Sequence, residues 1–269
     1  MPHLLYLWPR VSQMLSRAGR ALLLFDYDGT LTPIVDRPDL AVLAPGTKAL
    51  LAGLHEDKRF VVGIISGRSL EDILSRVGVN GLVYAGNHGL EIQGPDLDFT
   101  HPASEELRQT LGRVYTRLRE VLVDGPGAAL PGVFLEDKGL TLSFHYRLTP
   151  REHIKEVEEM FAAAVAPFLA EGQVRVSRGK MVLEVRPKGD WNKGTAITKI
   201  GETYRGWAGG SSVTVFFGDD VTDEDGFAVV QEWNGIAVMV GPAGQPTQAL
   251  YRLDSPQEVV ETLKLLSQL

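Results

Sequence analysis

The chain has 269 residues, of which 44% are hydrophobic and 23% charged, and its formal net charge is -7. At a typical size of about 150 residues per domain, this length predicts one large domain or two modest ones. The composition is that of a globular protein and excludes a disordered, collagen-like or coiled-coil chain. The sequence has no cysteine, which excludes disulfides, zinc–thiolate sites and a cysteine nucleophile.

The acidic balance, 27 basic against 34 acidic residues, argues against a nucleic acid as partner but is compatible with a small anionic substrate. Residues 1–20 lack the basic and then apolar pattern of a signal peptide. No apolar run in the sequence approaches the about 20 residues that span a membrane. We therefore expect a cytoplasmic protein without a membrane partner. Separately, we expect a monomer.

Short apolar runs that end abruptly in polar residues or glycine predict strands buried on both faces, as in parallel sheets. These runs cover residues 21–25, 60–65, 82–85, 213–217 and 236–240. Stretches with helical character alternate with them, at residues 45–59, 70–77, 193–204, 223–233 and 256–266. The alternation predicts an α/β fold, with a doubly wound and mostly parallel sheet.

The alternation breaks in the middle of the chain. There the pattern predicts a helix at 105–123, strands at 133–135 and 140–146, a helix at 151–169 and strands at 174–176 and 181–185. We interpret this α-β-β-α-β-β block, residues 102–186, as an α+β cap domain inserted into a core formed by residues 1–101 and 187–269. The Gly, Pro and charged residues at 93–96 and 186–190 are typical of hinges.

The first predicted strand runs into Asp26-Tyr27-Asp28-Gly29-Thr30. Because the backbone is extended there, Asp26 and Asp28 are expected to point in a similar direction, into the crevice at the carboxyl edge of the sheet. A carboxylate pair at that position suits a divalent cation. A simple turn is the alternative interpretation, since Asp and Gly are common turn residues.

The second strand ends in Ser66-Gly67-Arg68, just before a predicted helix. A hydroxyl, free backbone amides and a nearby guanidinium at a helix N-terminus form an anion site, although a plain N-cap has the same sequence signature. Lys193 begins another predicted helix, where its charge opposes the helix dipole. That placement costs stability unless the ammonium faces an anion; a solvated surface lysine is the alternative.

The strand at 213–217 runs into an acidic segment, residues 219–225, that holds five carboxylates in seven positions. In a closed structure these groups would repel one another unless a cation neutralised some of them. Mg²⁺ suits this role, because it binds a few carboxylates together with water and substrate phosphate. An acidic first helical turn explains Glu224 and Asp225, but it explains Asp219 poorly, because that residue stands at the strand end.

Together, Asp-x-Asp-x-Thr, a strand-end Ser, a helix-start Lys and Gly-Asp-Asp-x-x-Asp resemble, in order and spacing, the four motifs of the haloacid dehalogenase-like phosphatases. More narrowly, the chain is similar to the trehalose-6-phosphate phosphatase family. The stretches that carry this resemblance are residues 24–35, 65–68, 85–91, 136–139, 145–147, 183–187 and 218–225.

The resemblance implies a Mg²⁺-dependent phosphatase that hydrolyses trehalose 6-phosphate to trehalose and phosphate through an aspartyl-phosphate. Asp26 would be the nucleophile and Asp28 the general acid and base, with Lys193 and Ser66 assisting. The implied metal ligands are Asp26, the Asp28 carbonyl, Asp219 and Asp223, with Asp220 as a further candidate. The implied ligands of the phosphoryl oxygens are Thr30, Ser66, Gly67 and Lys193.

For the sugar, the resemblance implies contacts from Glu136, Lys138 and Glu184 in the cap, and Arg68, Asn87 and His88 are further candidates for substrate binding. An exposed ion pair between cap strands and a buried, hydrogen-bonded histidine are the alternatives. A cap hinged near Gly94 and residues 188–190 would close over the site and exclude water.

Two other functions stay open on the sequence. One is a phosphatase for another sugar phosphate, such as sucrose phosphate or a mannosyl-phosphoglycerate. The other is a non-catalytic sugar-phosphate sensor with the same fold. A sensor would be expected to lose a catalytic carboxylate, and this chain keeps Asp26, Asp28 and Asp219.

Overall fold

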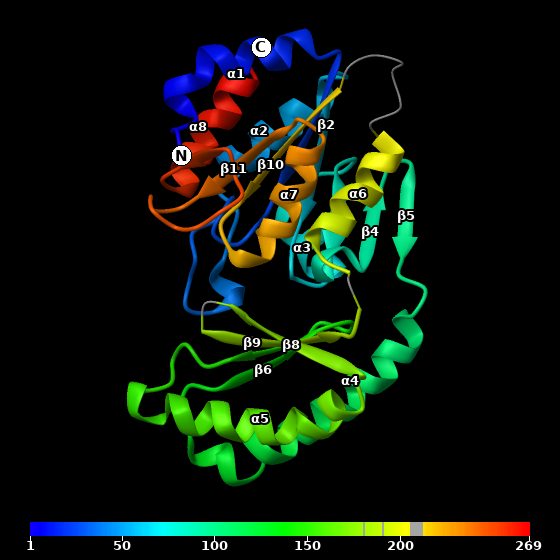
Figure 1. The fold of residues 1–269 in the computed structure, drawn as a ribbon, viewed down its shortest axis with the longest axis vertical. Coiled ribbons are helices and arrows are strands. Elements are labelled where there is room, and N and C mark those ends of the chain that lie inside the picture. The colour runs from blue at the N-terminus through cyan, green and yellow to red at the C-terminus, as the bar shows by residue number, and fades with distance from the viewer. Residues whose placement is uncertain (180, 190, 205–211) are drawn as a thin grey trace. The chain divides into compact units, whose positions relative to one another are not determined.

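The computed structural model describes residues 1–179, 181–189, 191–204 and 212–269, which divide into two compact units (Figure 1). The core unit comprises Met1–Phe99 and Trp191–Leu269, and the inserted unit comprises Thr100–Asp190. The inserted unit extends slightly beyond the predicted 102–186 at both ends. Within the described chain, none of the helices has the length and apolar character that crossing a membrane requires.

The core unit is built on an eight-stranded sheet with the strand order β12-β11-β10-β1-β2-β3-β4-β5. Neighbouring strands are parallel from β12 to β3, and β4 pairs antiparallel with β3. The strands are β1 (Arg20–Phe25), β2 (Phe60–Ile65), β3 (Val83–Gly86), β4 (Glu91–Gly94), β5 (Leu97–Thr100), β10 (Ser212–Gly218), β11 (Ile236–Val240) and β12 (Tyr251–Leu253). The predicted α/β fold with a mostly parallel sheet is confirmed.

Helices cover both faces of this sheet, which is why its central strands are largely apolar. In β1, Leu23 and Phe25 pack into one hydrophobic cluster, and Leu22 and Leu24 into the other. The first cluster includes residues of α1 (Trp8–Arg17), α2 (Pro45–Glu56), α3 (Leu70–Val77) and α8 (Pro256–Leu266). The second includes residues of α6 (Lys193–Tyr204) and α7 (Glu224–Glu232). The sheet is therefore doubly wound.

Residues 93–96, which the sequence indicated as a hinge, instead form the end of β4 and the two-residue turn to β5 at the edge of the core sheet. That prediction was wrong because a Gly-Pro-Asp stretch suits a tight turn as well as a linker. The sequence does not predict these two strands as apolar runs, because buried and exposed residues alternate along them, with Ile92 buried and Gln93 exposed. Such alternation is typical of edge strands with one solvated face. The other predicted hinge, residues 186–190, begins inside a strand, and its last residue, Asp190, lies outside the described residues.

The inserted unit contains a four-stranded sheet with the order β6-β7-β9-β8, all of it antiparallel. Its elements in chain order are α4 (Ser104–Leu118), β6 (Phe134–Asp137), β7 (Leu142–His145), α5 (Ile154–Ala170), β8 (Val174–Gly179) and β9 (Val182–Pro187). Leu142, Phe144 and Leu183 pack with Phe161 of α5 in a hydrophobic cluster of this unit. Because side chains alternate along a strand, one face of the sheet packs in this cluster and the other carries polar residues.

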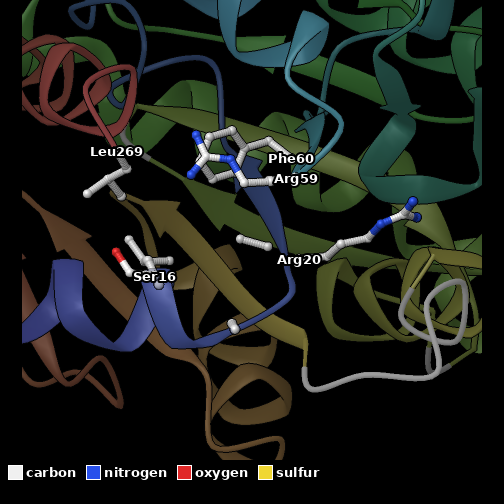
Figure 2. Close-up of a pocket in the computed structure, with 8 residues that line it drawn as sticks. Ser16, Arg20, Arg59, Phe60 and Leu269 are labelled. Atoms are coloured by element: carbon white, nitrogen blue, oxygen red, sulfur yellow. The ribbon is translucent and has the colours of Figure 1, made fainter.

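A small pocket lies where β1 and β2 begin (Figure 2). Its volume of about 20 Å³ admits roughly one water molecule. It is lined by Leu15, Ser16, Ala18, Arg20, Ala21, Arg59, Phe60 and Leu269. The pocket is therefore too small for a substrate and lies at the opposite end of β1 from the predicted site.

Candidate active site

The carboxyl ends of three neighbouring strands carry the polar residues of the predicted site. Asp26 follows β1, Ser66 follows β2 and Asp219 follows β10. The parallel register places Phe25, the last residue of β1, opposite Phe217 of β10 and Ile64 of β2, so the three strands end close together. Ligands of open α/β sheets bind in the crevice at this edge.

A lysine lies between two carboxylates at the centre of the site. The Nζ atom of Lys193 is 2.5 Å from Oδ1 of Asp26 and 2.6 Å from Oδ1 of Asp223. All three side chains are buried. Lys193 is the first residue of α6, and its contact with two anions explains why a lysine is tolerated at the positive end of a helix dipole.

Burial raises the pKa of the Asp26 carboxyl well above its usual range; the Lys193 ammonium lowers it, and the charges of Asp223 and Asp219 raise it further. Burial by itself would lower the pKa of Lys193, but the charges and hydrogen bonds of Asp223 and Asp26 outweigh it and raise that pKa. Lys193 therefore stays protonated. Lys193 contacts Asp26 and Asp223, and Asp219 is the third carboxyl of the same buried group, so the acidic side chains outnumber the one ammonium.

The same three carboxylates fit a metal ion. One oxygen each from Asp26, Asp219 and Asp223 lies within 4.8 Å of the other two. An all-oxygen donor set of this kind is what hard divalent cations bind in proteins. Such a cation would also offset the excess negative charge that Lys193 leaves uncompensated.

The backbone approaches this acidic group closely at Gly29. This residue has a φ of +93°, a conformation that favours glycine. A Cβ atom placed on Gly29 would collide with the carboxylate of Asp219. The turn that follows Asp28 therefore requires glycine for two reasons. Its backbone conformation favours glycine, and the Asp219 carboxylate leaves no space for a Cβ atom.

Asp223 and Asp220, the two other acids after β10 with predicted roles, make different contacts. Oδ2 of Asp223 accepts hydrogen bonds of 3.0 Å from the backbone N–H groups of Asp219 and Asp220, which fixes the carboxylate that Lys193 contacts. The Asp220 side chain instead accepts a 2.7 Å hydrogen bond from the N–H of Val221 and caps the helical turn Val221–Asp223. It is not part of the three-residue acidic group, so capping accounts for it better than the metal role expected from the sequence.

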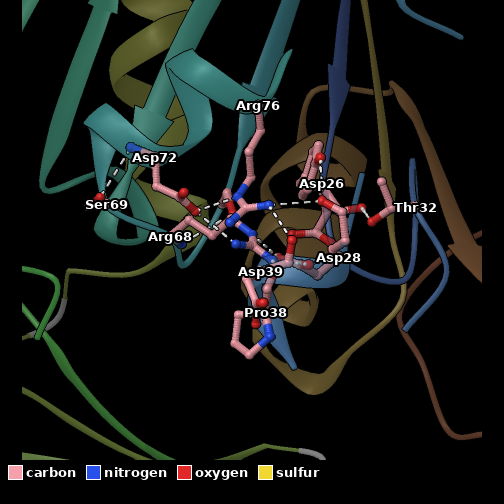
Figure 3. Close-up of polar contacts among 12 residues, drawn as sticks. Asp26, Asp28, Thr32, Pro38, Asp39, Arg68, Ser69, Asp72 and Arg76 are labelled. Carbon is pink, nitrogen blue, oxygen red and sulfur yellow. Dashed lines mark hydrogen bonds and ion pairs between the residues drawn. The ribbon is translucent and has the colours of Figure 1, made fainter. Parts of the chain in front are cut away.

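Asp28 contacts an arginine. Arg68 donates two hydrogen bonds of 2.7 Å to it, from Nε to Oδ2 and from Nη2 to Oδ1 (Figure 3). The guanidinium also donates to Asp72 at 2.7 Å and to the Pro38 carbonyl at 2.8 Å. The Arg68 side chain is only 6% exposed. Its bonds to the protein favour a supporting role over the substrate contact that the sequence suggested.

The residues predicted to hold phosphate lie in the loops after β1 and β2. Ser66 is buried, and its Oγ accepts a 3.2 Å hydrogen bond from the Arg68 N–H. Thr30 is buried too, and its hydroxyl has no hydrogen-bond partner among the described residues. A Cβ atom on Gly67 would lie 2.7 Å from the His88 ring. Their contacts with phosphate stay predictions.

Asn87 and His88 pack beneath the loop that follows β2. Both have left-handed backbone conformations, with φ of 50° and 57°. Their N–H groups donate to the carbonyls of Arg68 at 2.7 Å and Ser66 at 2.8 Å, respectively. The Asn87 amide donates to Glu91 at 3.1 Å. Both side chains are buried, which favours support of the 66–68 loop over contact with substrate.

The three predicted sugar contacts of the inserted unit come together on its sheet. Nζ of Lys138 is 3.3 Å from Oε1 of Glu184. Oε2 of Glu136 lies 2.8 Å from Nε2 of His145, within hydrogen-bond distance. The register places Glu136 opposite Ser143, and Ser143 opposite Glu184, so both glutamates belong to one face of the sheet.

Sequence reasoning missed two residues of α3. Asp72 contacts Arg68, and Arg76 contacts Asp72. Arg76 donates to the same Oδ2 atom of Asp72 that Arg68 contacts, at 2.7 Å in both cases. The available signal was the spacing of four between Arg68, Asp72 and Arg76, which places opposite charges side by side on a helix.

The doubly wound sheet and the strand-end aspartates with a helix-start lysine define a haloacid dehalogenase-like fold, and solved structures of this class agree. The C-terminal domain of the Candida albicans trehalose-6-phosphate phosphatase superposes with a TM-score of 0.83 at 27% identity, covering 97% of this chain and 96% of that one. A model of the trehalose-phosphatase family matches residues 24–257. The chain belongs to this family.

Curated relatives include the trehalose-phosphate phosphatases of Mycolicibacterium paratuberculosis and Mycobacterium avium. Each is 38% identical to this chain, over 262 and 264 residues, respectively. Both alignments cover 94% of this chain but 64% of the relative. The chain therefore spans less than two thirds of the length of these relatives.

Proposed function

We propose that this protein is a Mg²⁺-dependent phosphatase that hydrolyses trehalose 6-phosphate to trehalose and inorganic phosphate. The observation that carries the proposal is the buried group of Asp26, Lys193, Asp219 and Asp223 at the carboxyl edge of the sheet, in a chain of the trehalose-phosphatase family. A sensor would need to bind phosphate, but it would not need a carboxylate held beside a buried lysine and a potential metal site.

In the proposed mechanism, Asp26 attacks the phosphorus, and the ester bond to the sugar breaks as the new bond forms. Asp28 gives its proton to the departing sugar oxygen. Water then attacks the phosphorus of the aspartyl-phosphate, passes a proton to Asp28 and releases Asp26 and phosphate. Each residue thereby returns to its starting state.

The other residues of the site hold charge and position. Lys193 orients Asp26 and stabilises negative charge on the transferring group, as positioned donors do best in a buried site. Ser66 and Thr30 supply hydroxyls to phosphoryl oxygens. Asp26, Asp219 and Asp223 would hold Mg²⁺, with the Asp28 carbonyl as a further ligand. The bound ion supplies positive charge that offsets repulsion between the phosphoryl group and the attacking carboxylate.

We further propose a division of labour between the two units, in which the core unit carries the chemistry and the inserted unit selects the sugar. Glu136, Lys138 and Glu184 offer carboxylates and an ammonium, which suit the many hydroxyls of a disaccharide. The cytoplasmic location and monomeric state expected from the sequence stay predictions.

A panel of sugar phosphates tests the proposal. Phosphate release is measured with Mg²⁺ on trehalose 6-phosphate, sucrose 6-phosphate, a mannosyl-phosphoglycerate and glucose 6-phosphate. We expect kcat/KM for trehalose 6-phosphate to exceed that for glucose 6-phosphate by about 100-fold or more, since a site built for sugar hydroxyls discriminates strongly. Equal turnover of glucose 6-phosphate would reject the substrate assignment, and binding without phosphate release would identify a sensor.

A further inference from the structure

We propose that Arg68 is a positioning residue for proton transfer by Asp28, and that Asp72 and Arg76 hold it in place. The inference rests on the proposed role of Asp28 as the general acid and base. Its basis is a continuous line of ionic contacts, Asp28–Arg68–Asp72–Arg76, that joins the loop after β1 to the surface of α3 (Figure 3).

The contact between Arg68 and Asp28 fixes an orientation as well as a distance. Two parallel hydrogen bonds of 2.7 Å run from one guanidinium edge to the two oxygens of one carboxylate. A single bond would leave the carboxylate free to rotate, whereas this paired geometry sets its plane. Lysine cannot reproduce it, because an ammonium is a point charge without a planar fork.

Helix α3 sets the position of Arg68 from one side. Arg68 precedes Ser69, the N-cap of α3, whose Oγ accepts a 3.2 Å hydrogen bond from the N–H of Asp72. The carboxylate of Asp72 then accepts from Arg68 and from Arg76. Arg76 in turn donates to the Ala41 carbonyl at 3.0 Å. Asp72 is therefore held between two arginines.

The loop after β1 sets the position of Arg68 from the other side. The guanidinium carbon lies 5.4 Å from the ring centre of Tyr27, the residue between the two catalytic aspartates. The Tyr27 hydroxyl donates to the Ala41 carbonyl at 3.1 Å, and the Pro38 carbonyl accepts from Arg68. Burial by itself would lower the pKa of Arg68, but the hydrogen bonds and charges of Asp28 and Asp72 outweigh it and raise that pKa.

This arrangement is compatible with both states that Asp28 must adopt. An ionised carboxylate has about four lone-pair sites, so each oxygen can accept from Arg68 and keep one site for water. When Asp28 carries a proton, the protonated oxygen donates to the sugar oxygen and still has acceptor capacity for Arg68. The fork can therefore hold Asp28 at one place through both proton transfers.

Substrates with different leaving groups distinguish a positioning role of Arg68 from a purely structural one. A sugar hydroxyl needs a proton as it departs, whereas p-nitrophenolate departs without one. Because kcat/KM reports the steps up to that departure, misplacing Asp28 should affect the sugar ester selectively. We expect kcat/KM for trehalose 6-phosphate to fall about 10-fold in Asp72→Asn and about 100-fold in Arg68→Lys. For p-nitrophenyl phosphate, we expect a change of about 3-fold or less.

Asp57→Asn is the matched control. Asp57 also binds an arginine, Arg59, and its side chain is 32% exposed against 31% for Asp72. Since Asp57 lies at the end of α2, outside the site, its variant should match the wild type on both substrates. The proposal is overturned if Asp72→Asn loses activity equally on both substrates, or if Arg68→Lys raises KM for both while kcat is unchanged.

The activity of the wild-type protein on the two substrates distinguishes a failure of this inference from a failure of the proposed function. If it hydrolyses p-nitrophenyl phosphate but not trehalose 6-phosphate, the substrate assignment alone fails. The losses of kcat/KM in the Arg68 and Asp72 variants are then compared between p-nitrophenyl phosphate and the sugar phosphate that the wild type hydrolyses fastest. If the wild type hydrolyses no phosphate ester, both the proposed function and this inference are overturned.

Discussion

The ammonium of Lys193 lies 2.5 Å from the carboxylate of Asp26, although 167 positions separate the two residues in the chain. The contact joins the two segments of the core unit, Met1–Phe99 and Trp191–Leu269, at the place where the chemistry is proposed to occur. Lys193 also contacts Asp223 at 2.6 Å. One cation thus contacts two buried carboxylates, and stability and catalysis are coupled at this point.

Replacing Lys193 with methionine would leave Asp26 and Asp223 buried without their counterion. Removal of one partner of a buried ion pair costs about 3–5 kcal/mol, so the free energy of unfolding in urea without divalent metal should fall by about that amount. Mg²⁺ should then restore more stability to Lys193→Met than to the wild type, because it replaces the missing positive charge. Equal stabilisation of both proteins by Mg²⁺ would refute this account of the site.

Gly29→Ala should weaken metal activation. The substitution places a Cβ against Asp219 and strains a backbone with φ of +93°. We expect the Mg²⁺ concentration for half-maximal activity to rise about 10-fold, together with a loss of about 1–3 kcal/mol of stability. Gly244→Ala is the control, since Gly244 has a φ of +98° and nothing lies within 4 Å of an added Cβ. A similar rise in that variant would show that backbone strain alone explains the effect.

Glu184→Gln should impair recognition of the sugar and leave the core chemistry intact. The change removes the negative charge that faces Lys138 and weakens the proposed contact with sugar hydroxyls. We expect kcat/KM for trehalose 6-phosphate to fall about 10-fold or more, while hydrolysis of p-nitrophenyl phosphate stays near the wild-type rate. Glu158→Gln, which alters another ion pair of the inserted unit, serves as control. Equal losses on both substrates would argue against a sugar-binding role.

Asp72 should contribute stability that depends on pH. Burial by itself would raise its pKa, but hydrogen bonds from Arg76 and Arg68 outweigh burial and lower it. A carboxyl whose pKa is lowered by folding stabilises the protein above its unfolded pKa of about 3.9, and this contribution disappears as the pH falls through the folded value.

The difference in unfolding free energy between wild type and Asp72→Asn tests this pH dependence. Because Asp72 is partly exposed, we expect about 1 kcal/mol or less from its charge. The difference should be steady between about pH 5 and pH 8 and should shrink below about pH 4. A difference that grows on acidification would be inconsistent with a lowered pKa.

Much of the fold could be predicted because its signals are local. The runs 60–65 and 236–240 coincide with β2 and β11, since strands buried on both faces leave uninterrupted apolar stretches. The hairpin β4–β5 and the strand β12 could not be found in this way. Buried and exposed residues alternate along them or the residues are too few, and what makes them strands is pairing with the adjacent strand at the sheet edge.

The place of the site could also be predicted, because the carboxyl ends of parallel strands meet at one edge. The direction of each side chain could not. Asp28 contacts Arg68, and Asp220 caps a turn, whereas Asp219 and Asp223 join Asp26. That division depends on two cations, Lys193 and Arg68, that approach from other elements, and no local pattern contains this information.

The most direct test of the central claim is the rate of phosphate release from trehalose 6-phosphate with Mg²⁺, compared between the wild type and Asp26→Asn. Unfolding curves of both proteins establish that the variant is folded. The account predicts that kcat falls by at least about 1,000-fold, because the amide cannot form the aspartyl-phosphate. Hydrolysis by folded Asp26→Asn at a rate near that of the wild type would contradict the assignment of Asp26 as the nucleophile.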